Sequence, residues 1–140
     1  MLFLLDTDHI SLLQRGNPHV IGRLAHINPE QIAVTVITAA EQFQGRLATI
    51  RRAKIEADVV QEYERLRQTI AFYRAIHIAP YSPAAATEWV RLRKAGIRIG
   101  TQDLRIAAIA LVLNLTLVTR NSRDFERVPL LHIEDWSRST

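Results

Sequence analysis

Carboxylate side chains recur at the points where the sequence predicts that buried strands end. The acidic residues and the one amide placed in this way are Asp6, Asp8, Glu41, Asp103, Asn121 and Asp124. Unpaired carboxylates at close range repel one another and raise one another's pKa, so a group of them needs a cation or a basic partner. Lysine is absent from these segments, and ligand sets made only of oxygen favour Mg²⁺ or Mn²⁺ over softer ions. We therefore expect a divalent metal site.

Each of these residues also has a purely structural interpretation. Asp8 suits the cap of a short helix, and Glu41 and Asp103 could each complement a helix dipole. The two polar residues after the fourth expected strand could shape a turn. Asp6 is the hardest to explain structurally, because it ends an apolar segment and has no neighbouring cation in the sequence. Taken together, the residues favour a metal site over several separate structural roles.

Five short segments predict the strands that must position these side chains. They are apolar or rich in β-branched residues, and they cover residues 1–5, 32–37, 76–79, 115–118 and 131–134. Helical segments separate them, which predicts a mostly parallel sheet covered by helices on both faces. Such sheets bind ligands beyond the carboxyl ends of their strands. Asp103 reaches the same edge if its helix runs antiparallel to the fourth strand.

Helix signals divide the rest of the chain. The expected caps are Thr7 or Asp8 before a helix that ends at Arg15 and Gly16, Thr38, Ser82 with Pro83 before a helix that ends at Gly96, and Thr101. A further short helix is expected over residues 18–26. Between Arg52 and Arg74, apolar residues at steps of three and four predict one long amphipathic helix. We interpret its charged faces as solvated.

Composition excludes several classes of protein and of site. The 140 residues predict a single domain over residues 1–140, and 48% of them are hydrophobic, which is enough for a core. The lack of cysteine excludes disulfides, zinc–thiolate sites, iron–sulfur clusters and cysteine nucleophiles. The sequence contains neither a glycine-rich phosphate loop nor a GxSxG elbow. Since no apolar segment is long enough for a signal peptide or a membrane span, we expect a cytoplasmic protein without membrane contact.

The basic residues and the histidines give weaker indications. The net charge is +4, and Lys54 and Lys94 are the only lysines among 18 basic residues. Arginine presents a fork of donors that suits phosphate, so the excess of arginine is compatible with a nucleic-acid partner. The five histidines lack metal-ligand spacing, and we expect each of them at the surface or half-buried.

Four motifs together resemble the PIN-domain ribonucleases, and most closely the VapC toxins of bacterial toxin–antitoxin pairs. They are LLDTDHIS at residues 4–11, VITAAEQFQG at 36–45, GTQDLRIAAIAL at 100–111 and LVTRNSRDFERVP at 117–129, followed by IEDW near the end. The resemblance implies a three-layer α/β/α sandwich with a mostly parallel sheet of about five strands. It also implies an endoribonuclease that depends on Mg²⁺, for which Mn²⁺ can substitute, and a cognate antitoxin that blocks it. We further expect a homodimer.

By their positions in the motifs, the resemblance implies that Asp6, Glu41 and Asp103 are three acids of the site. Many PIN domains place an acid at the fourth position, where this chain has Asn121, with Asp124 three residues later. The expected metal ligands are therefore Asp6, Glu41, Asp103 and Asp124, and the expected catalytic set adds Asn121. The candidates for holding RNA phosphates are Arg46, Arg51, Arg52 and Arg98.

Two other functions stay open from the residues alone. An apolar strand that ends in Asp-x-Asp also opens the haloacid-dehalogenase-type phosphatases, with Asp6 as nucleophile and Asp8 as general acid. That chemistry expects threonine or valine where Ile10 stands, and a lysine in a later motif, so it fits poorly. The other possibility is a non-catalytic RNA- or protein-binding module. Mutation of Asp6 separates such a module from an enzyme.

Overall fold

A parallel sheet of five strands forms the centre of the molecule. In the computed structural model, which describes residues 2–138, the strands are β1 (Phe3–Leu5), β2 (Ile32–Thr35), β3 (His77–Ala79), β4 (Thr116–Val118) and β5 (Ile133–Glu134). Their order across the sheet is β3-β2-β1-β4-β5, and every neighbouring pair is parallel. The predicted parallel sheet is therefore confirmed, with β1 at its centre.

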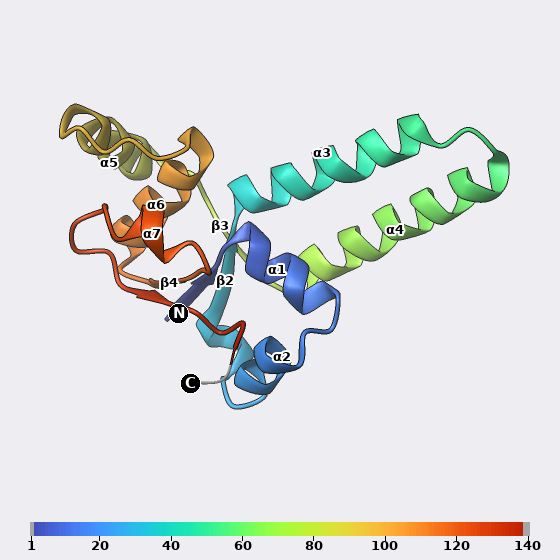
Figure 1. Ribbon diagram of the computed structural model, residues 1–140, viewed down its shortest axis with the longest axis horizontal. Helices are drawn as coiled ribbons and strands as arrows, with labels where there is room; N and C mark the ends of the chain where they lie inside the picture. Colours follow the sequence, from blue (N-terminus) through green and yellow to red (C-terminus); the bar gives the residue numbers. More distant parts are fainter. Residues whose placement is uncertain (1, 139–140) are drawn as a thin grey trace.

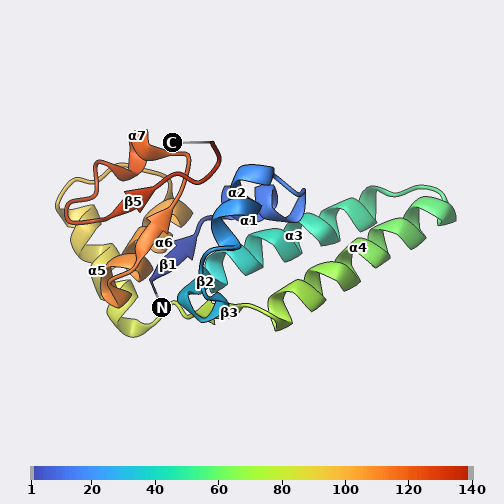
Figure 2. The same ribbon diagram turned by 90° about the horizontal axis from the view of Figure 1, so that it is seen from below.

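Helices cover both faces of this sheet. They are α1 (Thr7–Gln14), α2 (Pro18–Leu24), α3 (Val36–Arg52), α4 (Glu56–Arg74), α5 (Pro83–Lys94), α6 (Thr101–Leu113) and α7 (Ser122–Phe125), with a 3₁₀ turn at Pro29–Gln31. Figures 1 and 2 show α5 and α6 on one side of the molecule and α1 and α2 on the other, while α3 and α4 extend away from the sheet as an antiparallel pair. Within residues 2–138, no helix combines the length and the apolar character needed to cross a membrane.

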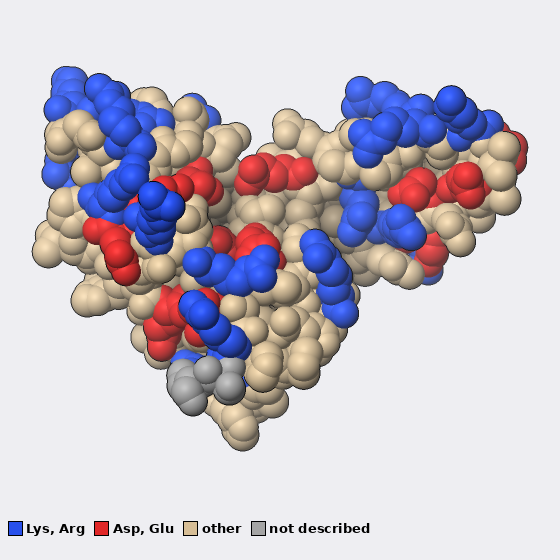
Figure 3. Space-filling model, in the orientation of Figure 1, with Lys and Arg blue, Asp and Glu red and all other residues tan. Residues whose placement is uncertain are grey.

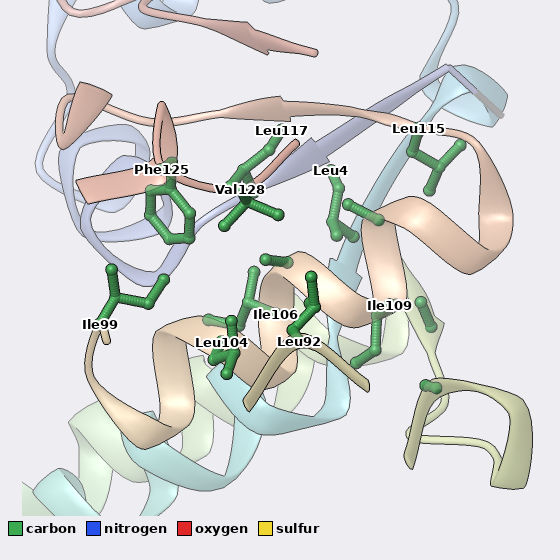
Figure 4. Close-up of a cluster of buried hydrophobic side chains, with 14 of the residues drawn as sticks. Leu4, Leu92, Ile99, Leu104, Ile106, Ile109, Leu115, Leu117, Phe125 and Val128 are labelled. Atoms are coloured by element: carbon green, nitrogen blue, oxygen red, sulfur yellow. The ribbon is translucent and has the colours of Figure 1, made fainter. Parts of the chain in front are cut away.

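Successive strand residues pack into two separate cores. Leu4 and Leu117, which are partners in the register of β1 and β4, belong to the core beneath α5 and α6. Figure 4 shows apolar side chains of α6 facing the strands in this core. Leu5 and Val118, one position further along, belong to the core beneath α1 and α2. This alternation follows from the pleat of a strand, and it gives the predicted three-layer α/β/α sandwich.

The long helix predicted from Arg52 to Arg74 is wrong at its start. Helix α3 ends at Arg52, Ala53 has extended backbone angles (φ −67°, ψ 128°), and α4 begins after Ile55. The chain reverses here without glycine or proline, because α4 packs antiparallel on α3. Tertiary packing therefore sets this break, and the predicted apolar period begins after it, at the N-cap Ile55.

Several helix caps also differ from the predictions. Thr35 caps α3 through a hydrogen bond from the Thr38 N–H, and α6 begins at Thr101 after Gly100, which has no side chain for capping. Asp6 caps α1 in place of Thr7 or Asp8. Each of the three helices thus begins earlier than expected, directly after the preceding strand or loop. The cap at Ser82 is confirmed by its hydrogen bond from the Ala85 N–H.

Candidate metal centre

Four carboxylates lie close enough at one edge of the sheet to influence one another. Asp6 follows β1 directly, Glu41 lies in the second turn of α3 after β2, and Asp103 and Asp124 lie in α6 and α7. Burial raises the pKa of the Asp103 carboxyl, and the negative charges of Asp6, Glu41 and Asp124 raise it further. We call these four residues the acid rim. In Figure 3, acidic atoms lie in the hollow between the lobe formed by α5 and α6 and the arm formed by α3 and α4.

Asp6 is held by hydrogen bonds that leave one of its oxygens free. Its Oδ1 accepts a hydrogen bond from the His9 backbone N–H at 2.8 Å and lies 3.3 Å from His9 Nδ1. The residue is only 8% exposed. Both bonds engage the same oxygen, so Oδ2 is the oxygen that remains available to a ligand.

The expectation that every histidine lies at the surface or half-buried is wrong for His9, which is fully buried. Its Nε2 accepts a hydrogen bond from the Trp136 backbone N–H at 3.2 Å. An imidazole nitrogen that accepts from a backbone N–H carries no proton, so the neutral ring carries its proton on Nδ1 and donates it to Asp6. One signal was present in the sequence: His9 stands three residues after the cap Asp6, where a side chain can reach back to the cap.

Glu41 is held by a chain of threonine hydroxyls. Thr7 Oγ1 donates to Glu41 Oε1 at 2.9 Å, and Thr7 and Thr38 share a second hydrogen bond of 2.9 Å between their hydroxyls. Since the Thr7 proton points to Glu41, Thr38 must be the donor to Thr7, and Thr35 donates to Thr38 in turn at 3.3 Å. The three protons therefore all point toward the carboxylate. Sequence reasoning missed this chain because its members belong to two different segments.

Asp8 is turned away from this arrangement. Both of its oxygens accept from Arg120, at 2.8 Å from Nη2 and 2.5 Å from Nε. Ligand atoms of Asp6, Asp8 and His9 lie within 4.8 Å of one another. This trio nevertheless makes a poor ligand set, because His9 uses both nitrogens for Asp6 and Trp136 and Asp8 uses both oxygens for Arg120. The acid rim around Asp103 is the better candidate.

Asn121 and Asp124 form the last part of the candidate site. Asn121 precedes α7, and its side-chain amide donates to Asp124 Oδ2 at 3.0 Å. Asn121 therefore faces Asp124 across the first turn of α7. Asn121 itself is exposed, whereas Asp124 is half-buried.

The donor set of the acid rim fits a hard divalent cation. Its side chains offer carboxylate oxygens, which are the ligands that Mg²⁺ and Mn²⁺ prefer. Burial, and after it the negative charges of Asp6, Glu41 and Asp124, raise the pKa of Asp103, so negative charge gathers at this site. A bound dication would compensate that charge.

Comparison with known proteins gives the family of the chain and the same fold. The PIN domain family matches residues 3–131. Ribonuclease VapC1 of Haemophilus influenzae strain R2866 is 30% identical over 145 residues, which cover 99% of this chain and 100% of that protein. The chain belongs to the PIN-domain family, among the VapC ribonucleases. This membership and the pairing of Asp8 with Arg120 exclude the phosphatase alternative, which needs Asp8 as a free general acid.

Solved structures of a VapBC protein and of a toxin–antitoxin complex resemble this PIN domain over 90% or more of its length. VapBC-1 from nontypeable Haemophilus influenzae has a TM-score of 0.77 at 26% identity, and the match covers 99% of this chain and 100% of that one. A toxin–antitoxin complex from Klebsiella pneumoniae has a TM-score of 0.65 at 26% identity, covering 90% and 92%. The arrangement of layers and strands is thus shared with these proteins.

Proposed function

We propose that this PIN domain is a Mg²⁺-dependent endoribonuclease and the toxin of a toxin–antitoxin pair. The observation that carries the proposal is the acid rim, in which the carboxylates of Asp6, Glu41 and Asp124, from three other segments, act on the pKa of Asp103. Membership among the VapC ribonucleases supports RNA as the substrate. The related toxin–antitoxin complex supports a cognate antitoxin as the partner, and we propose that the protein acts as a homodimer in the cytoplasm.

The proposed ligands of the ion are Asp6, Glu41, Asp103 and Asp124, and the proposed catalytic set adds Asn121. A bound Mg²⁺, which Mn²⁺ can replace, would supply an acidified water for attack on the phosphodiester and would stabilise charge on the leaving oxygen. The residues around it fix the ligand oxygens before the substrate arrives. His9 turns Asp6 so that Oδ2 is free, Thr7 orients Glu41, and Asn121 holds Asp124.

The part of the site around Asp6 is buried, and this burial keeps water away from it. Asp6, Thr35 and Thr38 are all buried, and carboxylates act more strongly on charged ligands where solvent is excluded. The opposite side, with Asn121 exposed and Asp103 half-buried, leaves room for a polymeric substrate to approach. Attack on a phosphodiester within a chain requires this one-sided opening.

Incubation of the purified protein, free of antitoxin, with total RNA tests the proposal. We expect new 5′ ends at defined positions in the presence of Mg²⁺ and none in EDTA, and mapping of those ends would identify the target. RNA binding without any cleavage at saturating Mg²⁺ or Mn²⁺ would contradict the proposal and favour a non-catalytic binding module.

A further inference from the structure

A polar groove runs between α1 and α3, away from the acid rim. It encloses about 500 Å³. Thr7 and Glu41 line it at the end that adjoins the acid rim, and Arg15, Arg46 and Arg52 line it further out. Along α3, Glu41 and Arg52 are eleven residues apart, which corresponds to roughly 16 Å of helix. We call this feature the arginine groove.

The three arginines of the groove lack acidic partners in the described part of the chain. Within residues 2–138, Arg15, Arg46 and Arg52 take part in none of the ion pairs, whereas arginines elsewhere on the helices, such as Arg67 and Arg91, are paired with a glutamate three residues earlier. Three unpaired guanidinium groups in one concave surface repel one another, and an anionic ligand relieves that repulsion.

Arg46 is the most firmly held of the three. Its Nε donates to Thr69 Oγ1 at 3.1 Å, and Thr69 donates in turn to the Arg65 carbonyl at 2.9 Å. Thr69 is almost fully buried, so α4 anchors a guanidinium that belongs to α3. The Nη groups of Arg46 are the donors left for a ligand, and a planar pair of donors suits a phosphate.

We propose that the arginine groove holds the phosphate backbone of a single RNA strand as it leaves the acid rim. The inference rests on the proposed function, because it assumes that the scissile phosphate lies at Glu41 and its neighbours. Phosphates further along that strand then meet Arg46 and afterwards Arg52. Continuity with the acid rim favours RNA over a peptide, since Glu41 belongs to both the groove and the rim, and Thr7 of the groove donates to Glu41.

The lining of the groove indicates contact with the backbone of the strand and not with its bases. None of the described residues that line it is aromatic, so the groove offers no stacking platform of the kind that holds unpaired bases. Gln14 and Gln42, which could contact base edges, donate hydrogen bonds to each other at 3.1 and 2.9 Å. Contacts to phosphate position a strand without selecting its sequence. Selection of the RNA target must then arise outside this groove.

The chain offers a matched control in two neighbouring residues. Arg51 and Arg52 are both exposed in the last turn of α3, but only Arg52 lines the groove. Arg98, another candidate from the sequence, lies between α5 and α6 and does not line it either. Arg15 was not among the candidates from the sequence, because those lie near the second and third motifs and Arg15 lies at the end of α1.

The test measures binding of a short unstructured RNA by fluorescence anisotropy in EDTA, where cleavage is blocked, over a range of salt concentrations. Arg52→Gln and Arg15→Gln should each weaken binding and reduce the slope of log affinity against log salt by about 0.7, the value for one lost phosphate contact on a single strand. Arg51→Gln should leave the slope unchanged. Equal losses for Arg51→Gln and Arg52→Gln, or no loss for Arg52→Gln and Arg15→Gln, would overturn the inference.

Two further experimental outcomes separate this inference from the proposed function. If Arg52→Gln weakens the antitoxin complex but leaves RNA binding unchanged, the groove is a protein site and the inference is wrong. If the wild-type protein binds no RNA in EDTA, the groove does not hold the strand by itself, and the inference is also overturned. Mg²⁺-dependent cleavage by the wild-type protein is measured separately, and it decides the proposed function in either case.

Discussion

The two halves of the acid rim differ in how their carboxylates are held. On the half that follows β1 and β2, His9 fixes Asp6 and a chain of threonine hydroxyls fixes Glu41. On the other half, burial and neighbouring charges raise the pKa of Asp103, and within residues 2–138 the Asp124 carboxylate has one side-chain hydrogen bond, from the exposed Asn121. We call these the held half and the open half.

This difference indicates that folding fixes one half of the site and that a bound ion fixes the other. The held half is built from buried groups whose hydrogen bonds exist without any ion, so its geometry is set by folding. In the open half, the repulsion on Asp103 at neutral pH would be relieved by a cation, so we expect its geometry to depend on the ion. Substitutions in the held half should therefore change both stability and activity, whereas those in the open half should change mainly the response to metal.

The largest effect on stability is expected for His9→Ala. The substitution removes a fully buried ring, leaves the Trp136 N–H without its acceptor and leaves Asp6 with only the His9 backbone bond of the two, which should lower the free energy of unfolding by about 3 kcal/mol. Urea denaturation measures the change. The exposed His19 provides the control, and His19→Ala should have no effect. If both variants are equally stable, the held half is not fixed by folding.

A smaller effect, mainly on activity, is expected for Thr7→Val. Valine keeps the shape of threonine but cannot donate to Glu41, so the chain of hydroxyls ends without its acceptor. We expect a loss of about 1 kcal/mol in stability and a roughly tenfold fall in kcat, which corresponds to 1.4 kcal/mol in the barrier. Thr7→Ser should restore both. Wild-type kcat in Thr7→Val would show that Glu41 does not need this donor.

Asp103→Asn should stabilise the metal-free protein at neutral pH. The folded state raises the pKa of Asp103 above its ordinary value of 3.8, so this group lowers stability as the pH rises through the folded pKa, and the penalty vanishes below 3.8. Because Asp103 is only half-buried, the gain should stay below about 1 kcal/mol. Thermal unfolding in EDTA at neutral and acidic pH measures it. A gain of equal size at both pH values would contradict the electrostatic explanation.

The smallest effect is expected for Asn121→Ala in the open half. The substitution removes one exposed hydrogen bond to Asp124, so stability should change by less than about 0.5 kcal/mol. Mn²⁺ affinity should fall slightly, because Asp124 loses its orientation but keeps its charge. A large loss of stability without metal would show that the open half is also fixed by folding, and the distinction between the halves would fail.

The sequence predicted the parts of this molecule that depend on local patterns. Apolar segments located all five strands, and the acids that follow them lie at the expected edge. The break between α3 and α4 could not be predicted, because Ala53, Lys54 and Ile55 are compatible with a helix and only antiparallel packing excludes it. Long-range contacts decide such a feature.

The sequence could not predict the hydrogen bonds that hold the site, because they join residues that lie far apart in the chain. The bond from Trp136 to His9 joins residues 127 positions apart, and the pair of Asp8 and Arg120 joins residues 112 apart. Asp8 was interpreted as a helix cap because its local pattern suits one, but a distant arginine uses both of its oxygens. Asp6, directly before it, is the actual cap.

The most direct test of a metal centre at the acid rim compares Asp6→Asn with Asp8→Asn in the Mg²⁺ dependence of RNA cleavage. The two aspartates are separated by one residue and carry the same charge, but only Asp6 belongs to the acid rim, while Asp8 is bound by Arg120. We predict that Asp6→Asn cleaves no RNA even at saturating Mg²⁺, and that Asp8→Asn retains cleavage with an unchanged Mg²⁺ requirement. Wild-type cleavage by Asp6→Asn, or equal loss in both variants, would contradict a metal centre at the acid rim.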